Sequence, residues 1–237
     1  MSTIFFFFCT MLQMSVVSGS RPSHTASLIF LHGSGGTGPM AKEGIKMIYG
    51  KNFIFPHIRI LYPTAPLIPY TPSAGCLRHV WFNRHSISLA APEDLTTIEP
   101  IAEEINKLID KEVKEGIDVK RIILGGFSMG SSLAMQMGYR FRRDIGGVFV
   151  LSSFLNQYSK VYEVLDSSLD SDHPPLFMCH GEKDDVVPYT WGERTFEELR
   201  KRGVKGEFHS FSNLYHNISK EELVMLKEWI LKQLPDD

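Results

Sequence analysis

A glycine-flanked serine between an apolar run and a helix-forming run constrains this chain more than any other stretch. Residues 122–124 are apolar, residues 126–130 read GFSMG, and residues 133–137 are helix formers. This pattern predicts a buried strand that turns sharply into a helix. Glycines two residues before and after Ser128 leave room for the turn, because a Cβ at either position would make strand and helix collide.

The surroundings of Ser128 are those that the G-x-S-x-G motif of a nucleophile elbow requires. At the head of a helix, the helix dipole and free amide groups favour developing negative charge. The alternative interpretation is a glycine-rich turn with an incidental serine, because the five-residue pattern alone is weak. The flanking strand and helix favour the nucleophile.

Composition limits the remaining possibilities. The chain has 237 residues, of which 43% are hydrophobic and 22% charged, enough for one large α/β core. A net charge of -2 without a block of like charges gives no case for a nucleic-acid partner. Three separated cysteines, none in a C-x-x-C pair, argue against a disulfide scaffold and a zinc site. We therefore expect neither a metal nor a cofactor.

Residues 1–22 form an apolar leader, and residues 23–237 are predicted to form a single domain. The leader contains four consecutive phenylalanines and no charged side chain before Arg21. It resembles a signal peptide but lacks a preceding Lys or Arg, and it is short for a bilayer span. We expect a cytoplasmic protein without stable membrane insertion, with secretion as the alternative, and a monomer or weak dimer.

Strand-like and helix-like segments alternate after the leader, which predicts an α/β fold with a mostly parallel sheet covered on both faces. Two helices are predicted to open with capping boxes, Thr190 with Glu193 and Ser219 with Glu222. The predicted strands and helices are as follows: strands at 27–31, 58–62, 122–124, 147–152, 176–179 and 207–211, and helices at 42–49, 93–116, 190–203 and from 219 onward.

The glycine-rich stretch after the first strand has two interpretations. Gly33, Gly35 and Gly38 formally match the G-x-G-x-x-G dinucleotide fingerprint, but the next strand ends in Pro63 rather than an acidic residue that could hold a ribose. The alternative is the His-Gly loop that supplies an amide to an oxyanion hole. The serine elbow downstream favours this second interpretation, with Ser34 and Met129 as the amide donors.

The stretch from 63 to 85 is rich in proline and aromatic residues and has no clear period. Residues 63–72 are predicted to form a surface loop. Residues 67–85 are typical either of a segment that lines a site or of a long packed loop. On the first interpretation, Trp81 and Phe82 contact the substrate.

The remaining catalytic groups follow from chain order, because the partners of an elbow serine arrive as acid and then histidine, in loops after strands. His216 lies in the loop after the last strand, whereas His209 lies within that strand. Asp184 and Asp185 share the loop after the preceding strand, and both are candidates for the acid. His216 would take the proton of Ser128 during attack on a carbonyl, and the acid would orient the histidine.

Four motifs resemble those of the acyl-protein thioesterase and lysophospholipase family of α/β-hydrolases: LIFLHGSGGTG, RIILGGFSMG, CHGEKDDVVP and NLYHN. The resemblance covers residues 26–235. It implies Asp184, four residues after the histidine of the H-G-x-x-D turn, as the acid. It also implies cofactor-free hydrolysis of S-acylated proteins and small carboxylic esters, with one family member preferring short acyl chains. Gly36, Asn83 and Ser131 depart from the family pattern.

Two hypotheses follow. The first is a serine hydrolase that cleaves acyl thioesters, including those of palmitoylated proteins, and short-chain carboxylic esters. The second is a non-catalytic α/β-hydrolase module that binds acylated partners, motivated by the departures near the predicted oxyanion loop.

Overall fold

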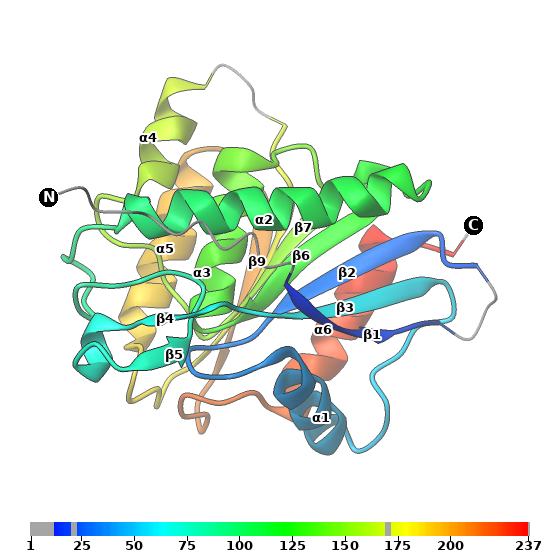
Figure 1. Cartoon of the computed structure of the whole chain (residues 1–237), viewed down its shortest axis with the longest axis horizontal. Helices are drawn as coiled ribbons and strands as arrows, with labels where there is room; N and C mark the ends of the chain where they lie inside the picture. The colour runs from blue at the N-terminus through cyan, green and yellow to red at the C-terminus, as the bar shows by residue number, and fades with distance from the viewer. Residues whose placement is uncertain (1–11, 20–22, 169–171, 237) are drawn as a thin grey trace, which may run out of the picture.

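A seven-stranded sheet forms the centre of the protein (Figure 1), in a computed structural model that describes residues 12–19, 23–168 and 172–236. The strand order is β1-β3-β2-β6-β7-β8-β9. The strands of this sheet are β1 (Gln13–Val17), β2 (Ala26–Leu31), β3 (Ile58–Thr64), β6 (Ile122–Phe127), β7 (Gly147–Leu151), β8 (Leu176–Gly181) and β9 (Gly206–Phe211). The α-helices are α1 (Gly38–Tyr49), α2 (Leu95–Lys114), α3 (Met129–Gln136), α4 (Lys160–Ser167), α5 (Tyr189–Lys201) and α6 (Lys220–Gln233).

The predicted mostly parallel sheet with helices on both faces is confirmed. Only the pairing of β1 with β3 is antiparallel among the described strands of this sheet. Neighbouring residues Leu28 and Ile29 point to opposite faces, yet both are fully buried. Ile29 belongs to the core under α2, α3, α4 and α5, and Leu28 to the core under α1 and α6. Figure 1 shows α2 crossing in front of the sheet.

Strand β1 lies within the predicted leader, before the predicted domain boundary at residue 22. Residues 13–17 pair in register with β3, from Gln13 opposite Thr64 to Val17 opposite Ile60. The pairing satisfies the backbone groups on the outer edge of β3, which would otherwise be exposed. Leader residues 1–11 and 20–22 lie outside the described residues.

The segment after β3 is more ordered than the predicted surface loop. Strand β3 continues through Pro63, which is tolerated because the pairing of β3 with β2 already ends at Leu61. Strands β4 (Leu67–Pro69) and β5 (Leu77–His79) then form an antiparallel ribbon with a short 3₁₀ turn between them.

The starts of α5 and α6 show that only one of the two predicted capping boxes forms. The box of Ser219 with Glu222 is confirmed at the start of α6. The box of Thr190 with Glu193 is wrong, because α5 already begins at Tyr189 after Pro188 and has no side-chain cap. Within the part of the chain that the structure describes, no helix combines the length and apolar character needed to cross a membrane.

Candidate active site

Ser128 stands in a sharp turn between β6 and α3, as the sequence predicts. Its φ of 53° lies in the left-handed region that residues with a Cβ rarely adopt. The flanking glycines are needed chiefly for the approach of strand β2. A Cβ at Gly126 or Gly130 would lie 2.1 or 2.2 Å from the carbonyl oxygen of Leu31. The elbow and the end of β2 therefore pack backbone to backbone.

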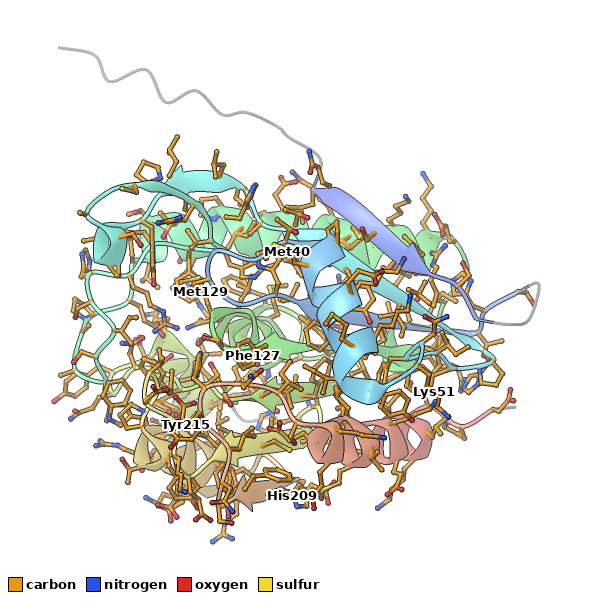
Figure 2. The ribbon with its side chains drawn as sticks, turned by 90° about the horizontal axis from the view of Figure 1, so that it is seen from below. Met40, Lys51, Phe127, Met129, His209 and Tyr215 are labelled. Atoms are coloured by element: carbon orange, nitrogen blue, oxygen red, sulfur yellow. The ribbon has the colours of Figure 1, made fainter. Side chains whose placement is uncertain are left out.

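Ser128, His216 and Asp184 form one hydrogen-bonded chain. The Ser128 hydroxyl donates to His216 Nε2 over 3.0 Å, and His216 Nδ1 donates to Asp184 Oδ2 over 2.8 Å. Each residue follows the carboxyl end of a parallel strand, β6, β9 and β8 respectively. In Figure 2, the sequence neighbours Phe127, Met129 and Tyr215 lie toward the same end of the molecule, away from Lys51.

The structure also separates the candidates that the sequence left open. Asp184 is 8% exposed and contacts His216, whereas Asp185 is exposed to solvent. His209 lies on β9, with its ring stacked against Phe177 at a centroid distance of 5.3 Å.

The Asp184 carboxylate is held by several donors besides His216. Its Oδ1 accepts from the amides of Val186 and Val187 over 3.0 and 2.8 Å, and His180 Nε2 lies 3.4 Å from Oδ2. Burial by itself would raise the pKa of Asp184, but the hydrogen bonds from His180, His216 and the two amides outweigh it and hold the pKa well below its ordinary value. Asp184 is therefore ionised at neutral pH.

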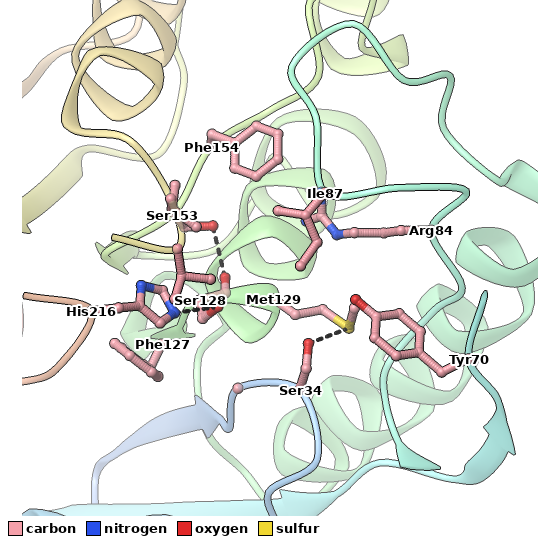
Figure 3. Close-up of a pocket in the computed structure, with 13 residues that line it drawn as sticks. Ser34, Tyr70, Arg84, Ile87, Phe127, Ser128, Met129, Ser153, Phe154 and His216 are labelled. Atoms are coloured by element: carbon pink, nitrogen blue, oxygen red, sulfur yellow. Dashed lines mark hydrogen bonds between the residues drawn. The ribbon is translucent and has the colours of Figure 1, made fainter. Parts of the chain in front are cut away.

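Ser34 and Met129, whose amides are the predicted oxyanion donors, contact each other through their side chains and line the cavity with Ser128. Met129 opens α3, so its N–H has no acceptor within the helix. Ser34 lies across from it, and the Ser34 hydroxyl donates to Met129 Sδ over 3.6 Å (Figure 3). The first turn of α3 and the loop after β2 thus face the same point.

His32 fixes the loop that carries Ser34. Burial lowers the pKa of His32 to about 4, so its ring is neutral at neutral pH. The ring therefore donates from Nδ1 to the carbonyl of Gly33 over 2.7 Å and accepts at Nε2 from the amide of Ala65 over 3.0 Å. Trp81 Nε1 donates to the carbonyl of His32 over 2.7 Å.

A cavity of about 230 Å³ opens above Ser128. The predicted contacts Trp81 and Phe82 do not line it. Both are buried in the core, at 1% and 4% exposed. Their aromatic character reflects packing, with Trp81 supporting the His32 loop instead of a substrate.

The sequence did not predict which residues between β3 and α2 line the cavity. They are Tyr70, Arg84 and Ile87, joined by Phe154 from the loop after β7 (Figure 3). No local sequence signal identifies Arg84, which follows Trp81, Phe82 and Asn83 in a stretch without periodicity. Among residues 12–19, 23–168 and 172–236, no cluster of His, Cys, Asp or Glu side chains is arranged to hold a metal ion.

Comparisons with known proteins agree with this geometry. The family model described as Phospholipase/Carboxylesterase matches residues 12–234. Mouse lysophospholipase-like protein 1 is 49% identical over 214 residues, covering 90% of this chain and 89% of the mouse protein. Acyl-protein thioesterase 1 homolog 1 of Dictyostelium discoideum is 33% identical, covering 95% and 98%. The crystal structure of Zea mays acyl-protein thioesterase 2 has a TM-score of 0.83 and 26% identity, covering 94% and 99%. The family resemblance predicted from the motifs is confirmed.

Proposed function

The chain belongs to the phospholipase/carboxylesterase family of α/β-hydrolases and is a hydrolase, and we propose that it hydrolyses acyl thioesters and short-chain esters through Ser128, His216 and Asp184. The observation that carries this proposal is the unbroken hydrogen-bonded chain from Asp184 to Ser128 at the floor of a cavity.

Each residue has a defined part in the proposed reaction. His216 Nε2 takes the proton of Ser128 as Oγ attacks the acyl carbonyl, and then gives it to the leaving thiol or alcohol. The ionised Asp184 holds the ring with Nδ1 protonated and stabilises the imidazolium. The amides of Ser34 and Met129 stabilise the oxyanion, each contributing on the order of 3 kcal/mol. Water then attacks the acyl-enzyme by the same route.

The proposed substrates are S-acylated proteins and small acyl esters. The names of the Dictyostelium and maize relatives as acyl-protein thioesterases support the first class. The cavity supports short acyl groups, because about 230 Å³ is below the roughly 300–1,000 Å³ of pockets that enclose drug-sized ligands. Palmitoyl removal is therefore proposed as the slower of the two activities.

Turnover of p-nitrophenyl esters from acetyl to palmitoyl tests the proposal, with labelling by a fluorophosphonate probe as the second readout. Wild-type protein should be labelled and should turn over short chains fastest. Ser128→Ala should lose labelling, and its kcat should fall by roughly 10⁴- to 10⁶-fold while its thermal midpoint is kept. Undiminished turnover in Ser128→Ala would reject the proposal. Folded wild-type protein that neither reacts nor is labelled would favour the non-catalytic module.

A further inference from the structure

Arg84 places a charged group in the cavity wall. The residue is only 8% exposed, although it lines the cavity. Its Nη2 donates to Ser132 Oγ over 2.7 Å, whereas Nη1 is buried without any hydrogen-bond partner. Burial lowers the pKa of Arg84 to about 10, so the guanidinium is still protonated at neutral pH.

The surroundings of Arg84 stabilise the cation without pairing it with an anion. Its guanidinium lies 5.0 Å from the ring centroid of Phe82 and 4.8 Å from that of Phe154, within cation–π range. Glu93 is a carboxylate whose charge stabilises the Arg84 cation. Its two oxygens accept hydrogen bonds from other groups, from Gln136 Nε2 over 2.7 Å and from the amide of Lys160 over 2.9 Å.

An unsatisfied N–H on a buried cation is costly, and a ligand acceptor in the adjoining cavity would remove that cost. A carboxylate is the acceptor that a guanidinium binds best, because two parallel hydrogen bonds match its planar shape. Figure 3 shows Arg84 reaching toward Phe154 and Ile87, in the same cavity that contains Ser128. Arg84 and Ser128 therefore line the same cavity, in which a substrate of Ser128 would bind.

We propose that Arg84 binds a carboxylate at the distal end of a short acyl group, which makes half-esters and half-thioesters of short dicarboxylic acids preferred substrates. This inference rests on the proposed function. Ser128 Oγ bonds to the acyl carbon as its bond to the leaving sulfur or oxygen breaks, and the serine proton passes through His216 to the leaving group. Hydrolysis of the acyl-enzyme then releases a dicarboxylate. Arg84 is a specificity residue that touches the substrate away from the reacting atoms.

Arg84 also connects to the nucleophile, which sets the choice of controls. Ser132 Oγ lies 2.8 Å from Ser153 Oγ, and Ser153 donates to the carbonyl of Ser128 over 2.7 Å. A variant at Arg84 could therefore alter the elbow as well as substrate binding. Ser132→Ala breaks this connection but keeps the guanidinium, and Arg78→Gln removes one positive charge from an exposed position on β5.

The test compares p-nitrophenyl monoglutarate with p-nitrophenyl pentanoate, which have acyl groups of equal length. Ser128→Ala supplies the background, including spontaneous cleavage of the half-ester. The readout is kcat/KM for the glutarate half-ester divided by kcat/KM for the pentanoate ester. Arg84→Gln should lower this ratio about ten-fold or more, as expected for a lost charge-assisted hydrogen bond. Arg78→Gln should leave the ratio within about two-fold, and Ser132→Ala, which keeps the guanidinium but removes its hydrogen-bond partner, should lower the ratio less than Arg84→Gln does.

The outcomes separate the two proposals. An unchanged ratio in Arg84→Gln, with Ser128-dependent turnover of the pentanoate, overturns the role of Arg84 and leaves the proposed function standing. Absence of Ser128-dependent turnover of both esters overturns both. If Arg84→Gln fails to fold, inhibition of the wild-type protein decides. Free glutarate should then inhibit pentanoate ester turnover at a lower concentration than free pentanoate, and equal inhibition overturns the proposal.

Discussion

Ser128 occupies a backbone conformation that its neighbours must stabilise. Holding a residue with a Cβ at this positive φ costs on the order of 1–3 kcal/mol, and three hydrogen bonds hold it in place. The Ser128 amide donates to the carbonyl of Leu151 over 2.9 Å, and its own carbonyl accepts from the Ser132 amide and from the Ser153 hydroxyl. The strained backbone directs Oγ toward His216, so the free-energy cost of the strain accompanies the Ser128–His216 hydrogen bond.

Asp184→Asn should lower kcat for p-nitrophenyl butyrate by two to four orders of magnitude. The neutral amide cannot stabilise the imidazolium, and a donated N–H would favour the wrong tautomer of His216. Asp185→Asn is the matched control, because that neighbour is exposed, and it should keep nearly full activity. A loss confined to Asp185→Asn would show that the acid is assigned to the wrong residue.

The reactive residues could be predicted from the sequence because chain order and strand ends fix their positions. Ser128 and Asp184 each follow an apolar strand, His216 follows an alternating one, and parallel strands bring these ends to one edge of the sheet. The cavity residues could not be predicted in this way. Trp81 and Arg84 are three residues apart in an aperiodic stretch, and no local pattern indicates that the first packs inward while the second lines the cavity.

Helix α5 and strand β8 meet through a glycine that bears on the site. A Cβ at Gly192 would lie 2.2 Å from Nδ1 of His180, which is fully buried. His180 in turn donates from Nε2 to the carbonyl of Val187 over 2.9 Å and lies beside Asp184. The packing of α5 therefore positions the turn that presents Asp184.

Gly192→Ala should displace His180 and disturb Asp184. We expect kcat to fall about ten-fold and stability to fall by about 1–3 kcal/mol, since the packed interior cannot absorb the methyl group. Gly44→Ala, in helix α1 with no atom within 4 Å of the added Cβ, should be stabilising by about 0.5–1 kcal/mol at full activity. Denaturant unfolding and ester turnover measure both effects, and similar behaviour of the two variants would contradict the role of Gly192.

Most elements could be predicted because their periodicity and length agree with their burial. The departures have physical causes. The side-chain pattern of residues 13–17 does not distinguish strand β1 from the leader, because this edge strand is held mainly by backbone pairing with β3. Strand β3 passes through Pro63, which composition alone identifies with a loop.

Folding buries the Glu222 carboxyl group, and its titration affects the stability of the entire protein. Glu222 is fully buried at the start of α6, where its Oε2 accepts from the Ser219 amide over 2.6 Å while Oε1 has no partner. Burial raises the pKa of Glu222 from 4.5 to about 7. The folded chain therefore retains a proton that the unfolded chain has released. This contribution to stability is complete below pH 4.5 and is lost as the pH rises through 7.

Replacement of this carboxyl by an amide should remove that pH dependence. The free energy of unfolding of wild-type protein minus that of Glu222→Gln should fall by about 2–3 kcal/mol between about pH 5 and pH 8. The neutral His32, with a pKa lowered by burial, contributes an opposite trend, but it is present in both proteins and cancels in the difference. Urea unfolding at several pH values measures the difference. A constant difference across this range would contradict the prediction.

Part of the cavity wall comes from a different part of the chain than the proposed catalytic residues. The proposed triad and oxyanion donors follow β2, β6, β8 and β9, whereas the cavity residues Tyr70, Arg84 and Ile87 lie between β3 and α2. This stretch is one continuous segment that could be exchanged as a unit. Exchanging this stretch between relatives should transfer the acyl-chain preference and leave the catalytic reaction unchanged, provided that Trp81 is kept, because Trp81 holds the His32 loop. We therefore expect changes in this stretch to alter substrate preference while leaving the proposed catalytic residues in place.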